Sequence, residues 1–360
     1  MVETNIKNTN SRQRLDYIDV AKGLGMLTII WGHVCLGGLS NYIVYSFHIP
    51  LFFFLSGLVF SPKRYDNFGA FLKKRLKGLL VPYVMFSVLT WMVWAVYSYI
   101  THARVESYWM PLLQTLLAQG SEGYLIHNVP LWFVMCLFSV EVIYYFLSKF
   151  NDWFNILLCL ILCVLGVLST KALFFDFSTL PWSIDVALMA LPFYAAGSLL
   201  AKHVCHQKQI NMVKGNLLLC ALLFIVAATV VYFGAKYNGH VSMGHASLGR
   251  SPMVFYGTAV FGIVGFMILC IWMSLSTSNM IQGIKWIGRN SFRVMAIHNP
   301  IKGIVLVVLA KQFHTSPIKA SNNLLICLMA FVVTLIITFI IIMVIEWCLK
   351  TFLKRNSLLK

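Results

Sequence analysis

The sequence predicts an all-α, polytopic integral membrane protein with about ten transmembrane helices. Of its 360 residues, 59% are hydrophobic and 11% are charged, whereas a soluble domain has about 25% charged residues. The mean hydropathy is +0.80, and apolar runs near the roughly 20 residues needed to span a membrane recur along the chain. These observations exclude soluble, intrinsically disordered and collagen-like proteins.

Each predicted helix is an apolar run bounded by polar or basic segments. The first run follows Arg12, Arg14 and Asp16 and is as long as a full span, so we expect a transmembrane helix there and no cleavable signal. The last run is long for one span, so we expect it to tilt or to extend into the interface. In chain order the runs are 18–39, 42–62, 79–100, 129–148, 153–170, 183–201, 215–234, 253–276, 291–311 and 323–349.

The positive charges predict the orientation of the chain. With the N-terminus inside, most Lys and Arg residues lie in or beside segments on the inner face, and such residues mark the cytoplasmic side. The exceptions are Arg104, Lys171, Lys236, Arg250, Lys302, Lys311 and Lys319. We therefore expect both termini in the cytoplasm, at a plasma or inner membrane. The net charge of +17 then indicates a cytoplasmic face and no nucleic-acid partner.

The organisation predicted is one transmembrane domain, 15–349, between a cytoplasmic N-terminal tail, 1–14, and a basic cytoplasmic C-terminal tail, 350–360. The nine cysteines show no C-x-x-C or Cys/His spacing of the kind that binds zinc, so no metal site is predicted.

The first apolar run contains ionisable residues, which are costly in a membrane and usually functional. Lys22 and His33 are eleven residues apart, so on a helix they point within about 20° of the same direction, and Asp19 lies within about 40° of it. His33 stands about 16 Å beyond Lys22 along the axis. These residues could form a polar stripe, or Asp19 and Lys22 could simply pair at the membrane edge with His33 as an interior hydrogen-bonded histidine.

The second run adds His48 near its outer end and Ser56 in its interior. A short loop separates His48 from His33, so we expect the two imidazoles to approach each other in the outer half. An interfacial role for His48 and a helix-packing role for Ser56 would also explain these residues.

Two later segments add charge. The block FLKKRLKGLLVPY carries Lys73, Lys74 and Arg75, which could contact lipid headgroups or hold the phosphates of a polyanionic ligand. In GRNSFRVMAIHNP, we expect His298 in the inner part of its span, and Pro300 should bend the helix. Histidines spread over inner and outer depths indicate a path more than a metal cluster.

Together these segments resemble the acyltransferase-3 family of integral-membrane acyltransferases, in particular its fucose-4-O-acetylase-like members. The resemblance covers nearly the whole chain, and its most specific part is the basic residue followed after ten residues by histidine. It is carried by RLDYIDVAKGLGMLTIIWGH, SFHIPLFFFLSG, FLKKRLKGLLVPY, LWF and IGRNSFRVMAIH.

Three positions depart from the family pattern. Lys22 stands where the family often has Arg, Gly78 where a second Arg is common after Arg75, and Met295 where many members have Tyr. Lys22 keeps the charge of Arg without its fork geometry. The other two departures put in doubt a role for those positions.

The resemblance implies transfer of an acyl group, usually acetyl, from a cytosolic acyl-CoA to a hydroxyl of an extracytoplasmic glycan. The partners implied are acyl-CoA, a surface or lipid-linked glycan and membrane lipids, with no permanently bound cofactor. His33 would be the general base, or alternatively a transient acyl carrier. Further candidates are Lys22, Asp19 and His48 in catalysis, and Arg14, Lys73, Lys74, Arg75, Ser56 and His298 in substrate binding, with His298 at the donor end.

A second hypothesis fits the same architecture. A flippase or exporter of lipid-linked sugars would also combine many spans, basic inner loops and intramembrane histidines. It does not require the spacing of Lys22 and His33, so the ordered motifs favour the enzyme.

Overall fold

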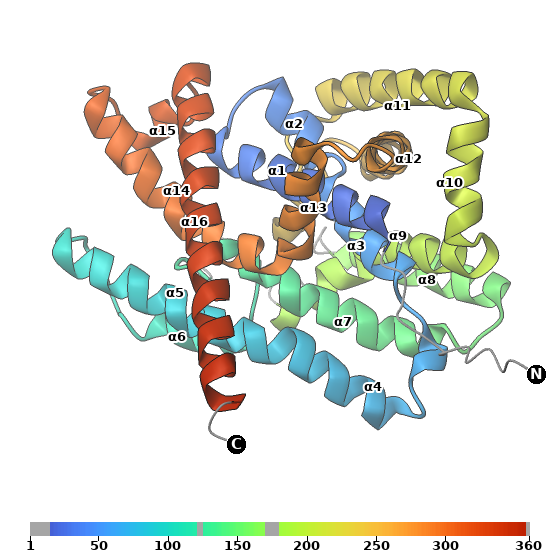
Figure 1. Ribbon diagram of the computed structural model, residues 1–360, viewed down its shortest axis with the longest axis horizontal. Coiled ribbons are helices and arrows are strands. Elements are labelled where there is room, and N and C mark those ends of the chain that lie inside the picture. Colours follow the sequence, from blue (N-terminus) through green and yellow to red (C-terminus); the bar gives the residue numbers. More distant parts are fainter. Residues whose placement is uncertain (1–14, 121–124, 170–179, 358–360) are drawn as a thin grey trace, which may run out of the picture.

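The computed structural model describes residues 15–120, 125–169 and 180–357, and these ranges form helices and no β-strand, which confirms the all-α class (Figure 1). The helices are α1 (Asp16–Val34), α2 (Leu39–Tyr45), α3 (His48–Leu58), α4 (Phe68–Arg75), α5 (Val81–Ile100), α6 (Met110–Leu113), α7 (Trp132–Leu147), α8 (Asp152–Ser169), α9 (Ile184–His203), α10 (His206–Gly215), α11 (Leu217–Asn238), α12 (Pro252–Ser274), α13 (Asn279–Arg289), α14 (Ser291–Gln312), α15 (Pro317–Ala320) and α16 (Leu324–Ser357).

Within the described ranges, nine helical segments are long and apolar enough to cross a membrane. The polytopic architecture is therefore confirmed. One of the nine combines α2 with α3, and another joins α4 to α5 through a π-helical turn at Leu76–Leu80. The first predicted span differs from the rest, because α1 contains Asp16, Asp19 and Lys22 and is not one of the nine.

Helix α1 instead forms the centre of the bundle. It packs against α3, α12, α13 and α14, and Figure 1 shows it near the middle of the view with α12 and α13 beside it. Residues such as Tyr17, Val20, Met26 and Ile30 are fully buried. A central helix can carry charged residues because neighbouring helices supply polar partners that lipid cannot.

Helix α16 extends well beyond a membrane span. Its 34 residues make a rod of about 50 Å, whereas the hydrocarbon core of a bilayer is about 30 Å thick. Only 324–348 is apolar enough to span. Its C-terminal turns, carrying Lys350 and Lys354, continue past the apolar segment.

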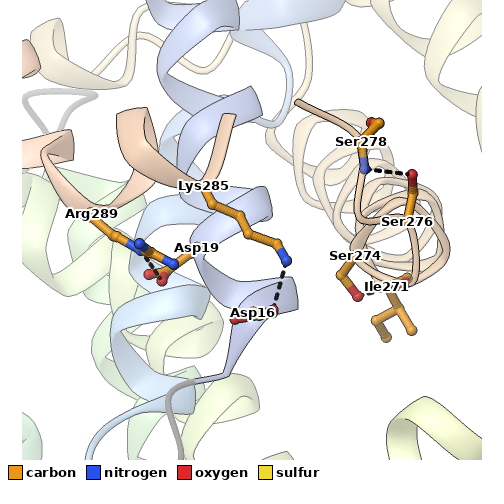
Figure 2. Close-up of polar contacts among 8 residues, drawn as sticks. All are labelled: Asp16, Asp19, Ile271, Ser274, Ser276, Ser278, Lys285 and Arg289. Atoms are coloured by element: carbon orange, nitrogen blue, oxygen red, sulfur yellow. Dashed lines mark hydrogen bonds and ion pairs between the residues drawn. The ribbon is translucent and has the colours of Figure 1, made fainter. Parts of the chain in front are cut away.

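The interface of α1 with α13 combines close backbone contact with ion pairs. A Cβ atom on Gly23 would lie 2.1 Å from the Ile284 carbonyl oxygen, so only glycine permits this approach. Beside it, the Lys285 ammonium lies 2.6 Å from an Asp16 carboxylate oxygen, and the Arg289 Nε lies 3.3 Å from Asp19 (Figure 2). Helix α13 thereby holds the N-terminal half of α1.

We expect Gly288→Ala to destabilise this interface. The new Cβ would lie 1.8 Å from the Asp19 carbonyl oxygen, and since that atom belongs to the backbone, the two helices must separate. Overpacking of this kind costs about 1–3 kcal/mol, which should appear as a lower melting temperature of the purified protein. Gly283→Ala on the same helix is the matched control, because its Cβ would meet nothing within 4 Å. Equal melting temperatures for both variants would contradict the close packing.

Candidate active site

A cavity of about 210 Å³ lies between α1, α3, α7 and α14. Its wall is largely apolar, and its polar side chains include Lys22, His33 and Ser56. Lys22 and His33 line the same cavity because eleven residues of helix return to nearly the same direction. The Ser56 hydroxyl donates to the Phe52 carbonyl at 2.8 Å. The structure thus brings three of the residues singled out in the sequence to one cavity.

His33 is paired with His298 across the bundle. The distance from His33 Nδ1 to His298 Nε2 is 2.9 Å, and the rings are parallel to within 2° with centroids 5.1 Å apart. The prediction that His298 and His33 lie at different depths is therefore wrong, whereas a role for His298 at the donor end stays a prediction. That prediction inferred depth from the position of each residue within its own helix, but the crossing of α1 and α14 is set by side-chain packing between them.

The partners of His298 determine which nitrogen of each ring carries the proton. His298 Nδ1 lies 3.0 Å from the Val294 carbonyl and 2.9 Å from the Met295 carbonyl, and a carbonyl only accepts. Nδ1 must therefore carry the proton, so the Nε2 of a neutral His298 is an acceptor. His33 then donates from Nδ1, which leaves its own Nε2 with a lone pair. In this tautomer His33 is oriented to accept a proton.

His48 lies near His33, and the ring of Tyr45 is close to both histidines. His48 is buried, and its Nδ1 donates to the Val44 carbonyl at 2.7 Å. The Tyr45 ring lies 4.8 Å from the His48 ring and 6.5 Å from the His33 ring. His240, from the segment after α11, lies 5.5 Å from the same tyrosine. Burial, followed by the electrostatic effect of the nearby His245, lowers the pKa of His240.

Asp19 is not on the cavity wall. Its carboxylate is buried and contacts Arg289 of α13 (Figure 2). Lys22 and His33 therefore line the cavity together, whereas Asp19 contacts α13, which packs over this part of α1. Arg14, the other residue expected to support Lys22, lies outside the described residues.

The basic block on α4 divides into two kinds of residue. Lys73 and Lys74 are exposed, and the Lys74 ammonium lies 5.4 Å from the centroid of the Tyr65 ring. Arg75 instead points inward, with its Nε 2.9 Å from a carboxylate oxygen of Glu141. The Glu141 side chain is only 4% exposed, so this arginine neutralises a buried acid. The two lysines remain open to a soluble polyanion.

Pro300 creates a contact between α14 and the segment before α7. A proline has no N–H, so the carbonyl four residues earlier loses its helical donor. That carbonyl belongs to Ala296, and the side-chain amide of Asn128 donates to it at 2.6 Å. Asn128 is completely buried. Residues 125–128 are therefore fixed against α14 close to His298.

Several residues of this site were missed in the sequence. Glu141 had a visible signal, because a single acid inside an apolar run requires a partner or a function. Tyr45 stands three residues before His48, a spacing that places side chains on one face of a helix. Asn128 and His240 carried no comparable signal, since their contacts depend on distant elements.

Comparison with known proteins identifies the family of the chain. A family model described as an acyltransferase domain matches residues 15–343. No curated protein and no solved structure matches the chain. The match takes in every helix from α1 to α15 and most of α16, including both histidines of the pair. The chain is therefore a membrane acyltransferase and belongs to the acyltransferase-3 family.

Proposed function

We propose that this membrane acyltransferase is an O-acyltransferase, with acetyl as the expected group. The donor would be a cytosolic acyl-CoA and the acceptor a hydroxyl of a cell-surface or lipid-linked glycan at the cell membrane. The observation that supports it is the His33–His298 pair. It leaves an imidazole lone pair on His33, which lines a cavity whose wall also carries Lys22. Imidazole is suited to this work because it exchanges protons near neutral pH.

The proposed reaction contains two proton transfers, one as the C–O bond forms and one as the C–S bond breaks. As the acceptor oxygen attacks the thioester carbonyl carbon, His33 Nε2 takes the hydroxyl proton and a C–O bond forms. The C–S bond then breaks, and the leaving thiolate takes the proton from the His33 imidazolium. His298 acts through His33: its Nε2 accepts from the Nδ1–H, which orients the ring and stabilises its positive charge.

The remaining candidates fit the two ends of this reaction. On the orientation that the positive charges predict, Lys73 and Lys74 face the cytosol and would hold the phosphates of acyl-CoA. Lys22 would orient the donor inside the cavity, and Ser56 would hydrogen-bond the substrate. His48 would assist at the acceptor. Acyl-CoA acts as a co-substrate and not as a bound cofactor.

Mass spectrometry of surface glycans would test this function. We compare host cells that express the wild-type protein, cells that express His33→Ala at an equal membrane level, and cells without the gene. We expect the mass increment of an acyl ester only with the wild-type protein. Unchanged substituents with an altered amount of glycan at the surface would favour a flippase and contradict the proposal. An acylated His33 trapped in the purified protein would show that His33 carries the acyl group.

A further inference from the structure

A second cavity, of about 300 Å³, lies between the C-terminal half of α5, the segment 125–128 and α14. It is separate from the cavity that His33 lines, and no step described so far uses it. Lys302 lies on its wall, one helical turn after His298. On the expected orientation this cavity lies in the outer half of the bundle, where an extracytoplasmic acceptor would arrive.

Lys302 supplies an unusual charge to this cavity. The side chain is half-buried, and within the described part of the chain no acidic side chain pairs with it. A cation removed from water is costly unless an opposite charge or hydrogen-bond acceptors compensate it. A ligand with a negative charge would provide that compensation.

His127 supplies hydrogen-bonding groups that no described neighbour uses. Its side chain lines the cavity and is 3% exposed, and neither ring nitrogen has a hydrogen-bond partner among the described residues. Burial lowers the pKa of His127 to about 4, so the ring is neutral at neutral pH. A neutral imidazole offers one donor and one acceptor, which is the complement of a hydroxyl group.

Aromatic side chains form another part of the wall. Trp94 and Tyr97 of α5 both line the cavity. The Trp94 ring contacts Tyr108, with the centroids 6.0 Å apart, so the aromatic surface continues toward the segment after α5. Flat apolar rings beside a few polar groups are typical of ligand sites, and a sugar ring presents a matching face of C–H groups.

We propose that this cavity binds an anionic sugar unit of the acceptor. Lys302 pairs with its acidic group, His127 with its hydroxyls, and Trp94 and Tyr97 with the face of the ring. This inference extends the proposed function, because it names the acceptor as an acidic glycan. It rests on the proposed function in one respect, which is that the bound sugar is the acceptor. The aromatic wall and the unpaired imidazole favour a sugar over a phospholipid headgroup.

The test is a direct binding measurement on the full-length protein in nanodiscs of phosphatidylcholine. The probes are methyl β-glucuronide and methyl β-glucoside, which differ only in the carboxylate, and tryptophan fluorescence reports binding beside Trp94. We expect the glucuronide to bind about tenfold more tightly, a difference of about 1.4 kcal/mol. Lys302→Met should remove this preference, Lys302→Arg should keep it, and His127→Phe should weaken both sugars alike. Lys311→Met, an exposed lysine on the same helix, is the matched control.

Equal binding of the two sugars, no binding of either, or a preference that survives Lys302→Met would overturn the inference. So would loss of glucuronide binding when phosphatidylglycerol replaces part of the phosphatidylcholine, because a lipid headgroup would then occupy the site. Turnover of acetyl-CoA is measured separately on the same preparations. Sugar binding does not require turnover, so failure of this inference and failure of the proposed function are distinguishable.

Discussion

Replacing His33 by alanine should lower the kcat of acyl transfer by about 10²–10⁴-fold, the usual contribution of a positioned general base. The KM for acyl-CoA should change little, because the variant keeps the α4 lysines and Lys22. The measurement is steady-state release of free CoA by the purified protein with acyl-CoA and the glycan acceptor. His314→Asn, at an exposed position outside the cavity, should keep the wild-type rate. A His33→Ala variant with normal kcat would exclude the proposed base.

His298 should behave as a positioning residue in the same assay. His298→Leu removes the acceptor for the His33 Nδ1–H and should lower kcat, since the ring loses its fixed tautomer. His298→Gln retains an amide oxygen that can accept this hydrogen bond, so it should recover part of the rate. Equal losses in the Leu and Gln variants would show that His298 acts by something other than accepting from His33.

Arg75→Met should strongly destabilise the protein. It leaves the buried Glu141 without its cation, and removing one partner of a buried ion pair typically costs about 3–5 kcal/mol. Thermal unfolding of the detergent-solubilised protein would measure the loss. The double variant Arg75→Met with Glu141→Gln should recover most of it, because a neutral amide needs no counter-charge. Lys77→Met, an exposed cation just beyond α4, is the control.

The same variants separate two roles for Arg75. If Arg75 also contacts the phosphates of acyl-CoA, the double variant will regain stability and still show a raised KM for the donor. If Arg75 only pairs with Glu141, the double variant will regain both the stability and the wild-type KM for the donor. A single Arg75→Met variant that melts at the wild-type temperature would contradict the structural role.

The sequence predicts the helices of this protein well because each one depends on local composition. Apolar runs locate the spans, and the spacing of Lys22 and His33 places both on one cavity. Relations between helices could not be predicted in this way. The contact of His33 with His298 joins residues 265 positions apart, and the pairing of Arg75 with Glu141 depends on how the turn after α4 meets α7. Packing of side chains decides both.

The charged residues of α1 also show that contacts between helices could not be predicted from the sequence. The sequence predicted a span with a polar stripe, but it did not identify the partners of Asp16 and Asp19, which lie on α13. The partners sit on a short amphipathic helix between two spans, which the sequence offered only as a basic inner segment. Periodicity identifies the face of a helix, but the neighbour that covers this face comes from the tertiary structure.

Pro300 restricts which substitutions this part of the protein can accept. A proline within a helix is usually a defect that lipid-embedded proteins tolerate, but here the carbonyl it releases is the attachment point for Asn128. The helix that carries His298 and the segment that carries His127 are thus joined by a hydrogen bond that depends on the proline. A residue with a backbone N–H at position 300 would compete with Asn128 for the Ala296 carbonyl. Substitutions that keep this contact must therefore retain both Pro300 and Asn128, or replace the two residues together.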